Sequence, residues 1–224
     1  MKTAIVTGTT LGVGNALVNK LSELNYNVIA TSRYPENIKN VWGDNVKIER
    51  LDLIEKKSIE DLYEKYKDTQ IDLIVNNAAG GGWLEGEDFY NAFIQAHSLN
   101  VIGPALLNKL FSKNLSNSEN PLIIFISSFA GKYPYAGGIT YCNSKSALSS
   151  LAEILRIEYG PGLKIKVTEI RPASINTRES NYREAEFSMS VDDIVKTIVW
   201  VSEMPRYCNI DLVEMSPMFA KKYS

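Results

Sequence analysis

Three side chains with the chemistry for proton transfer lie close together in the sequence. Tyr141 and Lys145 are four residues apart, and Ser128 lies thirteen positions before the tyrosine. Residues at i and i+4 share one face of a helix, so the ammonium would stand beside the phenol. A neighbouring positive charge lowers the phenol pKa from about 10, which would let Tyr141 transfer protons near neutral pH. A serine hydroxyl from a separate strand end could hold a substrate oxygen beside that phenol.

A second pattern lies near the N-terminus, where a glycine-rich turn separates a predicted strand from a predicted helix. Residues 2–7 contain a short apolar run, and the segment Thr-Gly-Thr-Thr-Leu-Gly-Val-Gly occupies residues 7–14. An amphipathic helical pattern begins directly afterwards. This order suits a dinucleotide site, because glycines let the backbone approach a pyrophosphate and the helix N-terminus offers unpaired N–H groups. Considered alone, the motif also fits an ordinary glycine-rich connection.

Together, these motifs resemble the short-chain dehydrogenase/reductase family in its compact, single-domain branch. The glycines fall at 8, 12 and 14, whereas the commonest dinucleotide fingerprint is Gly-x-Gly-x-x-Gly. The epimerase-like branch of the family would need a glycine at position 11, where this chain has Leu11. The resemblance extends from Thr7 to about Met215. It implies a fold and a reaction class but says little about the substrate.

The predicted elements agree with one α/β domain over residues 1–224. Strand-like segments occupy residues 2–7, 27–31, 46–51, 71–75, 122–126, 164–170 and 210–214. Helical segments occupy residues 13–25, 56–67, 87–98, 101–115, 139–159 and 191–204. The alternation predicts a doubly wound, Rossmann-type parallel sheet of about seven strands with helices on both faces. Ligands bind such a sheet at the carboxyl ends of its strands, where the candidate residues fall.

The resemblance assigns cofactor contacts to residues that mostly follow strand ends. These are Gly8, Thr10, Gly12, Val13, Gly14, Ser32, Arg33, Asp52, Leu53, Asn77, Ala78, Ala79, Tyr141, Lys145, Pro172, Ile175 and Thr177. Arg33 favours NADP(H), because a guanidinium can pair with the 2′-phosphate. The alternative is an enzyme that prefers NAD(H), in which Arg33 is simply solvated. Asp52 would receive the adenine amino group or, alternatively, cap the helix that begins near residue 56.

The family pattern departs from this sequence at two positions of the cofactor set. Alanine stands at positions 79 and 173, where the family usually has glycine. One added methyl group would tighten the approach to the cofactor without blocking it. The backbone at Ile175 and the Thr177 hydroxyl would bind the nicotinamide carboxamide and thereby select the ring face that meets the substrate.

The same resemblance implies a catalytic set of Asn100, Ser128, Tyr141 and Lys145. Ser128 would polarise the carbonyl oxygen, Tyr141 would exchange a proton with it, and Lys145 would hold the nicotinamide ribose. Asn100 would hold a water beside Lys145, and it could also cap a helix that begins one residue later. The implied activity is an NADP(H)-dependent oxidoreductase that interconverts a carbonyl and an alcohol. A non-catalytic protein that senses a dinucleotide is the alternative, which the intact set disfavours.

Composition excludes several other classes of function. The net charge of −2 and the pI near 5.6 give no electrostatic case for nucleic acid or an anionic membrane. No apolar run approaches the roughly 20 residues of a membrane span. A first strand close to Met1 leaves no room for a signal peptide, so we expect a cytoplasmic protein. Cys142, Cys208 and His97 have no metal-ligand spacing, so we expect no metal site and two buried free thiols.

The remaining expectations concern the substrate and the assembly. The substrate would be a small carbonyl or alcohol compound beneath a charged lid at residues 178–190, with aromatic walls from Trp83, Tyr133 and Tyr135. Members of the family that this chain resembles usually pair through two long helices, which correspond here to residues 101–115 and 139–159, and the second carries more apolar surface than one sheet face readily covers. We therefore expect a homodimer or homotetramer that pairs through these helices.

Overall fold

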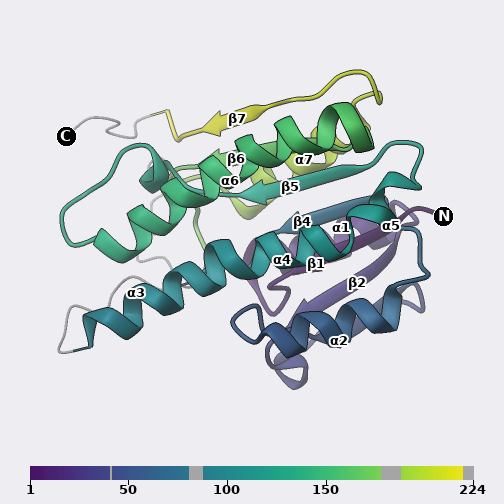
Figure 1. The fold of residues 1–224 in the computed structure, drawn as a ribbon, viewed down its shortest axis with the longest axis horizontal. Coiled ribbons are helices and arrows are strands. Elements are labelled where there is room, and N and C mark those ends of the chain that lie inside the picture. Colours follow the sequence, from purple (N-terminus) through teal and green to yellow (C-terminus); the bar gives the residue numbers. More distant parts are fainter. Residues whose placement is uncertain (41, 81–87, 178–187, 219–224) are drawn as a thin grey trace.

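The computed structural model describes residues 1–40, 42–80, 88–177 and 188–218, in which seven parallel strands form one sheet (Figure 1). The strands are β1 (Thr3–Thr7), β2 (Asn27–Ser32), β3 (Val46–Arg50), β4 (Leu73–Asn76), β5 (Leu122–Ile126), β6 (Lys166–Pro172) and β7 (Leu212–Met215). Their order is β3-β2-β1-β4-β5-β6-β7, which confirms the predicted doubly wound sheet. The strand order reverses between β1 and β4, and this switch point is where such folds bind ligands.

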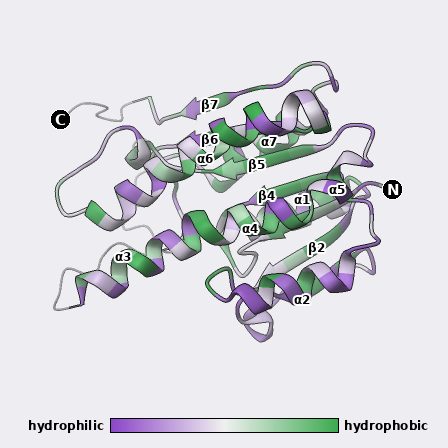
Figure 2. Cartoon of the chain, in the orientation of Figure 1, coloured by the Kyte–Doolittle hydropathy of each residue, from purple (hydrophilic) through white to green (hydrophobic). Residues whose placement is uncertain are grey.

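Helices cover both faces of this sheet. The helices are α1 (Gly12–Glu23), α2 (Lys56–Tyr66), α3 (Phe89–His97), α4 (Gly103–Leu110), α5 (Ser112–Ser116), α6 (Ile139–Leu163) and α7 (Val191–Glu203). One apolar cluster joins α2, α4 and α6 to one face, and a second cluster joins α1 and α7 to the other. Strand residues alternate between these clusters, as Ile5 and its neighbour Val6 illustrate. Figure 2 shows the central strands as largely hydrophobic, as expected for a sheet buried on both faces.

The main differences between predicted and observed boundaries occur in two helical regions and at three strand starts. The predicted helices 87–98 and 101–115 are joined, because a π-helical turn, Ser98–Ile102, connects α3 to α4 without a break. Helix α6 continues past the predicted end at residue 159, since Pro161 in its last turn removes only one N–H donor. It ends where Lys164 adopts a left-handed conformation with φ 57°. Strands β4, β6 and β7 each begin two residues later than predicted.

The described residues were also compared with the requirements of a membrane-spanning helix and of a metal site. None of the helices in the described ranges is both long and apolar enough to cross a membrane. Within the same ranges, no three side chains of His, Cys, Asp or Glu are grouped so that they could hold a metal ion.

Candidate active site

A cleft of about 550 Å³ lies at the carboxyl ends of the strands and gathers most of the predicted cofactor residues. Fifteen of the seventeen line it: Gly8, Thr10, Gly12, Val13, Ser32, Arg33, Leu53, Asn77, Ala78, Ala79, Tyr141, Lys145, Pro172, Ile175 and Thr177. Gly14 and Asp52 do not line the cleft. Of the predicted catalytic set, Ser128, Tyr141 and Lys145 line the same cleft and Asn100 lies behind it. One cavity therefore brings together the two groups of residues that the sequence motifs indicate.

The glycine turn is packed too closely to accept side chains. Gly8 has φ 72°, and a Cβ there would lie 2.8 Å from the Ala78 Cα. A Cβ on Gly14 would lie 2.3 Å from the Gly8 carbonyl oxygen and 2.6 Å from the Asn77 amide nitrogen. That Asn77 amide donates hydrogen bonds to the Thr7 and Gly8 carbonyls at 2.9 and 3.0 Å. The end of β4 therefore holds the turn in shape, which explains why Gly14 is needed although it does not face the cleft.

The N-terminus of α1 opens toward the cleft without a cap. Leu11 occupies the N-cap position and makes no side-chain hydrogen bond, and the first turn contains no acidic residue. Gly12 has φ 63°, and a Cβ there would project toward Thr177, 3.7 Å from its Cγ2. The unpaired N–H groups and the helix dipole of this terminus suit a phosphate group.

The end of β2 forms the next wall of the cleft. The hydroxyl groups of Thr10 and Ser32 are 2.8 Å apart, and the Tyr34 N–H donates to the Ser32 hydroxyl at 3.1 Å. The Arg33 guanidinium is exposed and lies 5.6 Å from the centre of the Tyr34 ring. Among the described residues it pairs with no carboxylate, so its charge is available to an anionic ligand.

Asp52 lies beside this wall, and its hydrogen bonds stabilise the local turn between β3 and α2. Its carboxylate accepts a hydrogen bond from the Ile54 N–H at 3.0 Å, and its own N–H donates to the Ser58 hydroxyl at 2.9 Å. The N-cap of α2 is Glu55, so the predicted capping role for Asp52 is wrong. The carboxylate holds a turn that brings Leu53 to the cleft, and the adenine contact of Asp52 stays a prediction.

The three predicted proton-transfer residues meet where β5 and α6 approach each other. Ser128 follows β5 and its hydroxyl accepts a hydrogen bond from the Ala130 N–H at 3.2 Å. Tyr141 lies in the first turn of α6, and Ser128 is close enough to the Tyr141 phenol to act on its pKa. The Lys145 ammonium lies 5.8 Å from the centre of the Tyr141 ring and donates to the Ile126 carbonyl at 3.1 Å.

The electrostatics of this triad differ from the expectation. Burial raises the pKa of Tyr141, and the nearby Ser128 hydroxyl acts in the opposite direction. Burial also lowers the pKa of Lys145 to about 8, while the charge of Glu169 acts to raise it. The expected lowering of the tyrosine pKa by Lys145 is therefore wrong. The physical reason is that burial of the Tyr141 phenol has the largest effect and that the Lys145 ammonium is hydrogen-bonded to a backbone carbonyl.

Asn100 connects two walls of the site from behind. Its amide donates to the Gly80 carbonyl at 3.0 Å and to the Ser144 hydroxyl at 2.9 Å, and its oxygen accepts from the Gly80 N–H at 3.2 Å. None of these bonds caps a helix. Asn100 lies in the π-helical turn Ser98–Ile102, a feature often found at functional sites. Its expected role in holding a water stays a prediction.

Other predicted residues lie elsewhere. Trp83 and residues 178–187 of the predicted lid lie outside the described residues. Tyr133 and Tyr135 are described but do not line the cleft. Cys142 and Cys208 are free, but only Cys142 is fully buried.

Sequence reasoning missed several residues at this site. The cleft is also lined by Tyr34, Asn37 and Ser127, and Ser127 is bonded to a buried carboxylate, Glu169. The sequence did contain a signal for Glu169, because Glu169 and Arg171 are charged residues in a strand that is expected to be buried. A charged pair two residues apart faces one side of a strand, and it needs a partner there.

The fold and the cleft define a dinucleotide-binding α/β oxidoreductase. A family model described as short chain dehydrogenase matches residues 2–186, and this chain belongs to that family. The NADP-dependent 3-hydroxy acid dehydrogenase YdfG of Escherichia coli O6:H1 is 30% identical over 236 residues, covering 96% of this chain and 94% of the relative. A probable NADP-dependent dehydrogenase of Haemophilus influenzae is also 30% identical, covering 96% and 93%. The structure of serine dehydrogenase complexed with NADP+ aligns with a TM-score of 0.86 and 26% identity, covering 96% and 94%.

Proposed function

We propose that this enzyme uses NADP(H) to interconvert a carbonyl and an alcohol through Ser128, Tyr141, Lys145 and Asn100. The observation that carries the proposal is the meeting of Ser128, Tyr141 and Lys145 in the cleft that the glycine turn opens into. The two relatives that match nearly the whole chain are both named as NADP-dependent.

The residues present fit an NADP(H) molecule. The uncapped terminus of α1 suits the pyrophosphate, and the exposed Arg33 guanidinium suits the 2′-phosphate. Thr177 and Ile175 at the far end of the cleft would hold the nicotinamide carboxamide. When bound, the cofactor supplies or accepts the hydride, and the protein supplies alignment and proton transfer.

Tyr141 is suited to donate a proton in the reducing direction. Its raised pKa keeps the phenol protonated at neutral pH, so the phenolic proton can pass to the substrate oxygen. The Ser128 hydroxyl lines the same cleft and lies near that phenol, so it can hold the same oxygen beside it. The Lys145 ammonium, with a pKa of about 8, is charged at neutral pH and would stabilise the phenolate that remains. Alcohol oxidation requires the phenolate, so its rate should rise with pH until Lys145 loses its proton.

A short 3-hydroxy acid is the substrate class that the relatives favour. YdfG is named for 3-hydroxy acids, and serine is itself an acid with a hydroxyl group on its third carbon. The test is the appearance of NADPH absorbance when the purified protein receives NADP+ and a panel of alcohols. The panel should contain L-serine, 3-hydroxybutyrate and 2-butanol, which separate a hydroxy acid from a simple secondary alcohol. Binding of NADP+ without turnover of any of these compounds, or of aldehydes and ketones in reverse, would favour a dinucleotide sensor.

We further propose that two chains pair through α4 and α6. Four large apolar side chains in or beside these helices are exposed: Ile102, Ile139, Ile154 and Ile157. Light scattering at micromolar concentration should give at least twice the mass of one chain. Ile154→Glu should dissociate this pair, whereas Ile48→Glu on the edge strand β3 should not. A wild-type mass of one chain would reject the proposal.

A further inference from the structure

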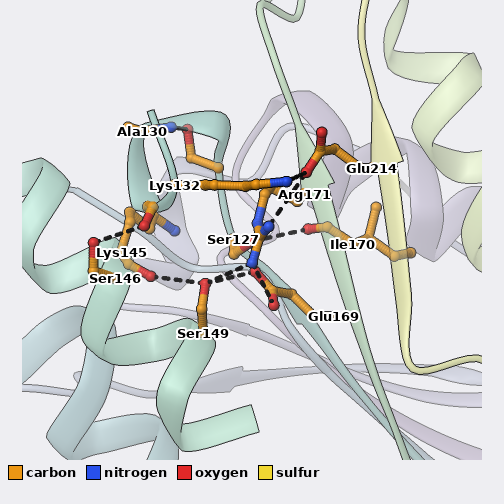
Figure 3. A network of polar contacts seen from close by, with 12 residues as sticks. Ser127, Ala130, Lys132, Lys145, Ser146, Ser149, Glu169, Ile170, Arg171 and Glu214 are labelled. Atoms are coloured by element: carbon orange, nitrogen blue, oxygen red, sulfur yellow. Dashed lines mark hydrogen bonds and ion pairs between the residues drawn. The ribbon is translucent and has the colours of Figure 1, made fainter. Parts of the chain in front are cut away.

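A buried charged cluster lies behind the catalytic residues, formed by Glu169 and Arg171 of β6 with Glu214 of β7 and Lys132 (Figure 3). Glu169 is 5% exposed and Arg171 is 9% exposed. Their contact is bidentate, with both nitrogen–oxygen distances at 3.1 Å. Arg171 also reaches Glu214 at 3.3 Å, and Lys132 joins Glu214 at the same distance. The chain of ion pairs therefore runs from the interior to the surface.

Glu169 is the member of this cluster that contacts the segments carrying the catalytic residues. One oxygen of its carboxylate accepts hydrogen bonds from the Ser127 hydroxyl at 2.5 Å and the Ser149 hydroxyl at 2.6 Å. Ser127 directly precedes Ser128. Ser149 lies one turn after Lys145 in α6, and its hydroxyl is also 3.1 Å from the Lys145 carbonyl oxygen. One carboxylate thus links the end of β5, the catalytic turn of α6 and the strand β6.

Such a carboxylate is costly if its purpose is only to stabilise the fold. Removing charges from water costs several kcal/mol per ion, and a well-packed apolar pair of similar volume is often equally stable. The charge of Glu169 has a second effect, because Lys145 is 1% exposed and its ammonium bonds to a neutral carbonyl. Burial lowers the pKa of Lys145, and the negative charge of Glu169 opposes this change.

The charged and titratable groups near this part of α6 come from three elements. Helix α6 contributes Tyr141 and Cys142, β6 contributes Glu169 together with Arg171, and α3, which packs against α6, ends at His97, bonded to Asn143. The neighbouring part of β5 and the π-helical turn contribute no charged side chain within the described residues. Glu169 is the carboxylate that acts on the Lys145 ammonium in this environment.

We propose that Glu169 is a positioning residue for this reaction, which holds Ser128 and Lys145 in register and keeps the Lys145 ammonium charged. The inference rests on the proposed function of Lys145 but concerns a residue that does not touch the substrate or cofactor. Glu169 acts through Ser127, through Ser149 and through its charge.

The test in the working enzyme compares Glu169→Gln with Glu214→Gln. In alcohol oxidation, activity should rise with pH and then level off as Lys145 loses its proton, because the phenolate fraction still grows while the ammonium fraction falls. Glu169→Gln removes the charge that favours the ammonium, so the pH at which activity levels off should fall by about one unit. Glu214→Gln breaks the ion pairs with Arg171 and Lys132 but leaves the bonds of Glu169 to both serines. It should leave the pH of this levelling-off unchanged, and an equal displacement in both variants would overturn the proposal.

A second measurement needs neither cofactor nor turnover. Because burial lowers the pKa of Lys145 to about 8, the folded state releases its proton before the unfolded state does. The stability of the wild type relative to Lys145→Met should therefore rise between about pH 8 and the unfolded value near 10.5. In the Glu169→Gln background this rise should begin about one unit lower, and an unchanged onset would refute the inference. If no alcohol is oxidised, the proposed function fails while this measurement still decides the role of Glu169.

The conservative variant covers the case in which Glu169→Gln does not fold. Glu169→Asp keeps the charge but retracts the carboxylate from Ser127 and Ser149. It should preserve the onset of the stability rise near pH 8 while lowering kcat by about tenfold, as expected for displaced catalytic groups. Wild-type kcat in Glu169→Asp would show that the carboxylate does not position the catalytic residues.

Discussion

The two ends of the cleft differ in whether backbone groups or side chains form them. The half formed by β1, β2 and β4 uses backbone, since the N–H groups of Gly8 and Thr9 both donate to the Thr31 carbonyl at 3.0 Å. The half formed by β5, β6 and α6 uses side chains, with Lys145 buried and held beside Tyr141 and Ser128. We expect the first half to hold the phosphate groups of the cofactor. In the second half, burial acts against the charged forms of both Tyr141 and Lys145.

The difference predicts how each half fails when a residue is changed. A substitution in the backbone half should distort the glycine turn, because there is no room for a methyl group at Gly8 or Gly14. A substitution in the side-chain half can remove a reactive group, such as one oxygen atom, without changing the packing. Variants in the two halves should therefore separate effects on cofactor binding from effects on turnover.

The largest effect is expected for Tyr141→Phe in the side-chain half. The change removes the phenolic oxygen and leaves the ring, so folding and NADP+ affinity should persist. Turnover should fall by at least the 10²- to 10⁴-fold range typical of general acid–base catalysis. Steady-state kinetics with a binding titration of NADP+ measure the two quantities. Tyr207→Phe is the matched control, since Tyr207 is 92% exposed. More than about a tenth of the wild-type rate in Tyr141→Phe would identify a different proton donor.

The next effect is expected for Gly14→Ala in the backbone half. The new Cβ would overlap the Gly8 carbonyl and the Asn77 amide, so the turn must open. Overpacking of this kind costs about 1–3 kcal/mol, which should appear as lower stability together with weaker NADP+ binding. Gly160→Ala is the control, because a Cβ there meets nothing within 4 Å. In a helix that change should stabilise the protein by about 0.5–1 kcal/mol. Unchanged NADP+ affinity in Gly14→Ala would mean that the turn does not shape the cofactor site.

The same contrast explains what could be predicted from the sequence. The backbone half can be recognised in the sequence from the spacing of its glycines and from the order of strand, turn and helix. The sheet and the turn were therefore predicted correctly. Tyr141, Lys145 and Ser128 were found because their spacing is local or is set by one strand end. The pKa values of Tyr141 and Lys145 could not be predicted in the same way. They depend on burial and, for Lys145, on the charge of Glu169, which lies in β6 and is distant in sequence.

Helix boundaries failed for a related reason. The segment Gly160-Pro161 is typical of a helix end, yet α6 continues to Leu163. Packing of a long helix against β6 outweighs the local preference of two residues. The uninterrupted passage from α3 to α4 was missed because a π-helical turn changes the helical periodicity on which the prediction depended.

The smallest effect in this comparison is expected for a side chain that stands in the backbone half. Arg33 follows β2 in the cleft, exposed and without a carboxylate partner among the described residues. A guanidinium paired with a 2′-phosphate contributes about 1.5–3 kcal/mol, which corresponds to about a ten- to hundred-fold preference for NADPH over NADH. The preference should be moderate, because Leu11 occupies the other position where a basic residue could reach the phosphate.

Arg33→Asp should reverse this preference, since a carboxylate repels the phosphate and accepts a hydrogen bond from the 2′-hydroxyl of NADH. Lys39→Asp is the matched control, because it makes the same change of charge at an exposed residue that does not line the cleft. The values of kcat/KM with both cofactors for the three proteins decide the matter. Reversal in Arg33→Asp alone would assign the preference to one local contact. An unchanged ratio in that variant, or an equal change in Lys39→Asp, would reduce Arg33 to a solvated loop residue. The backbone half would then bind its cofactor through shape alone.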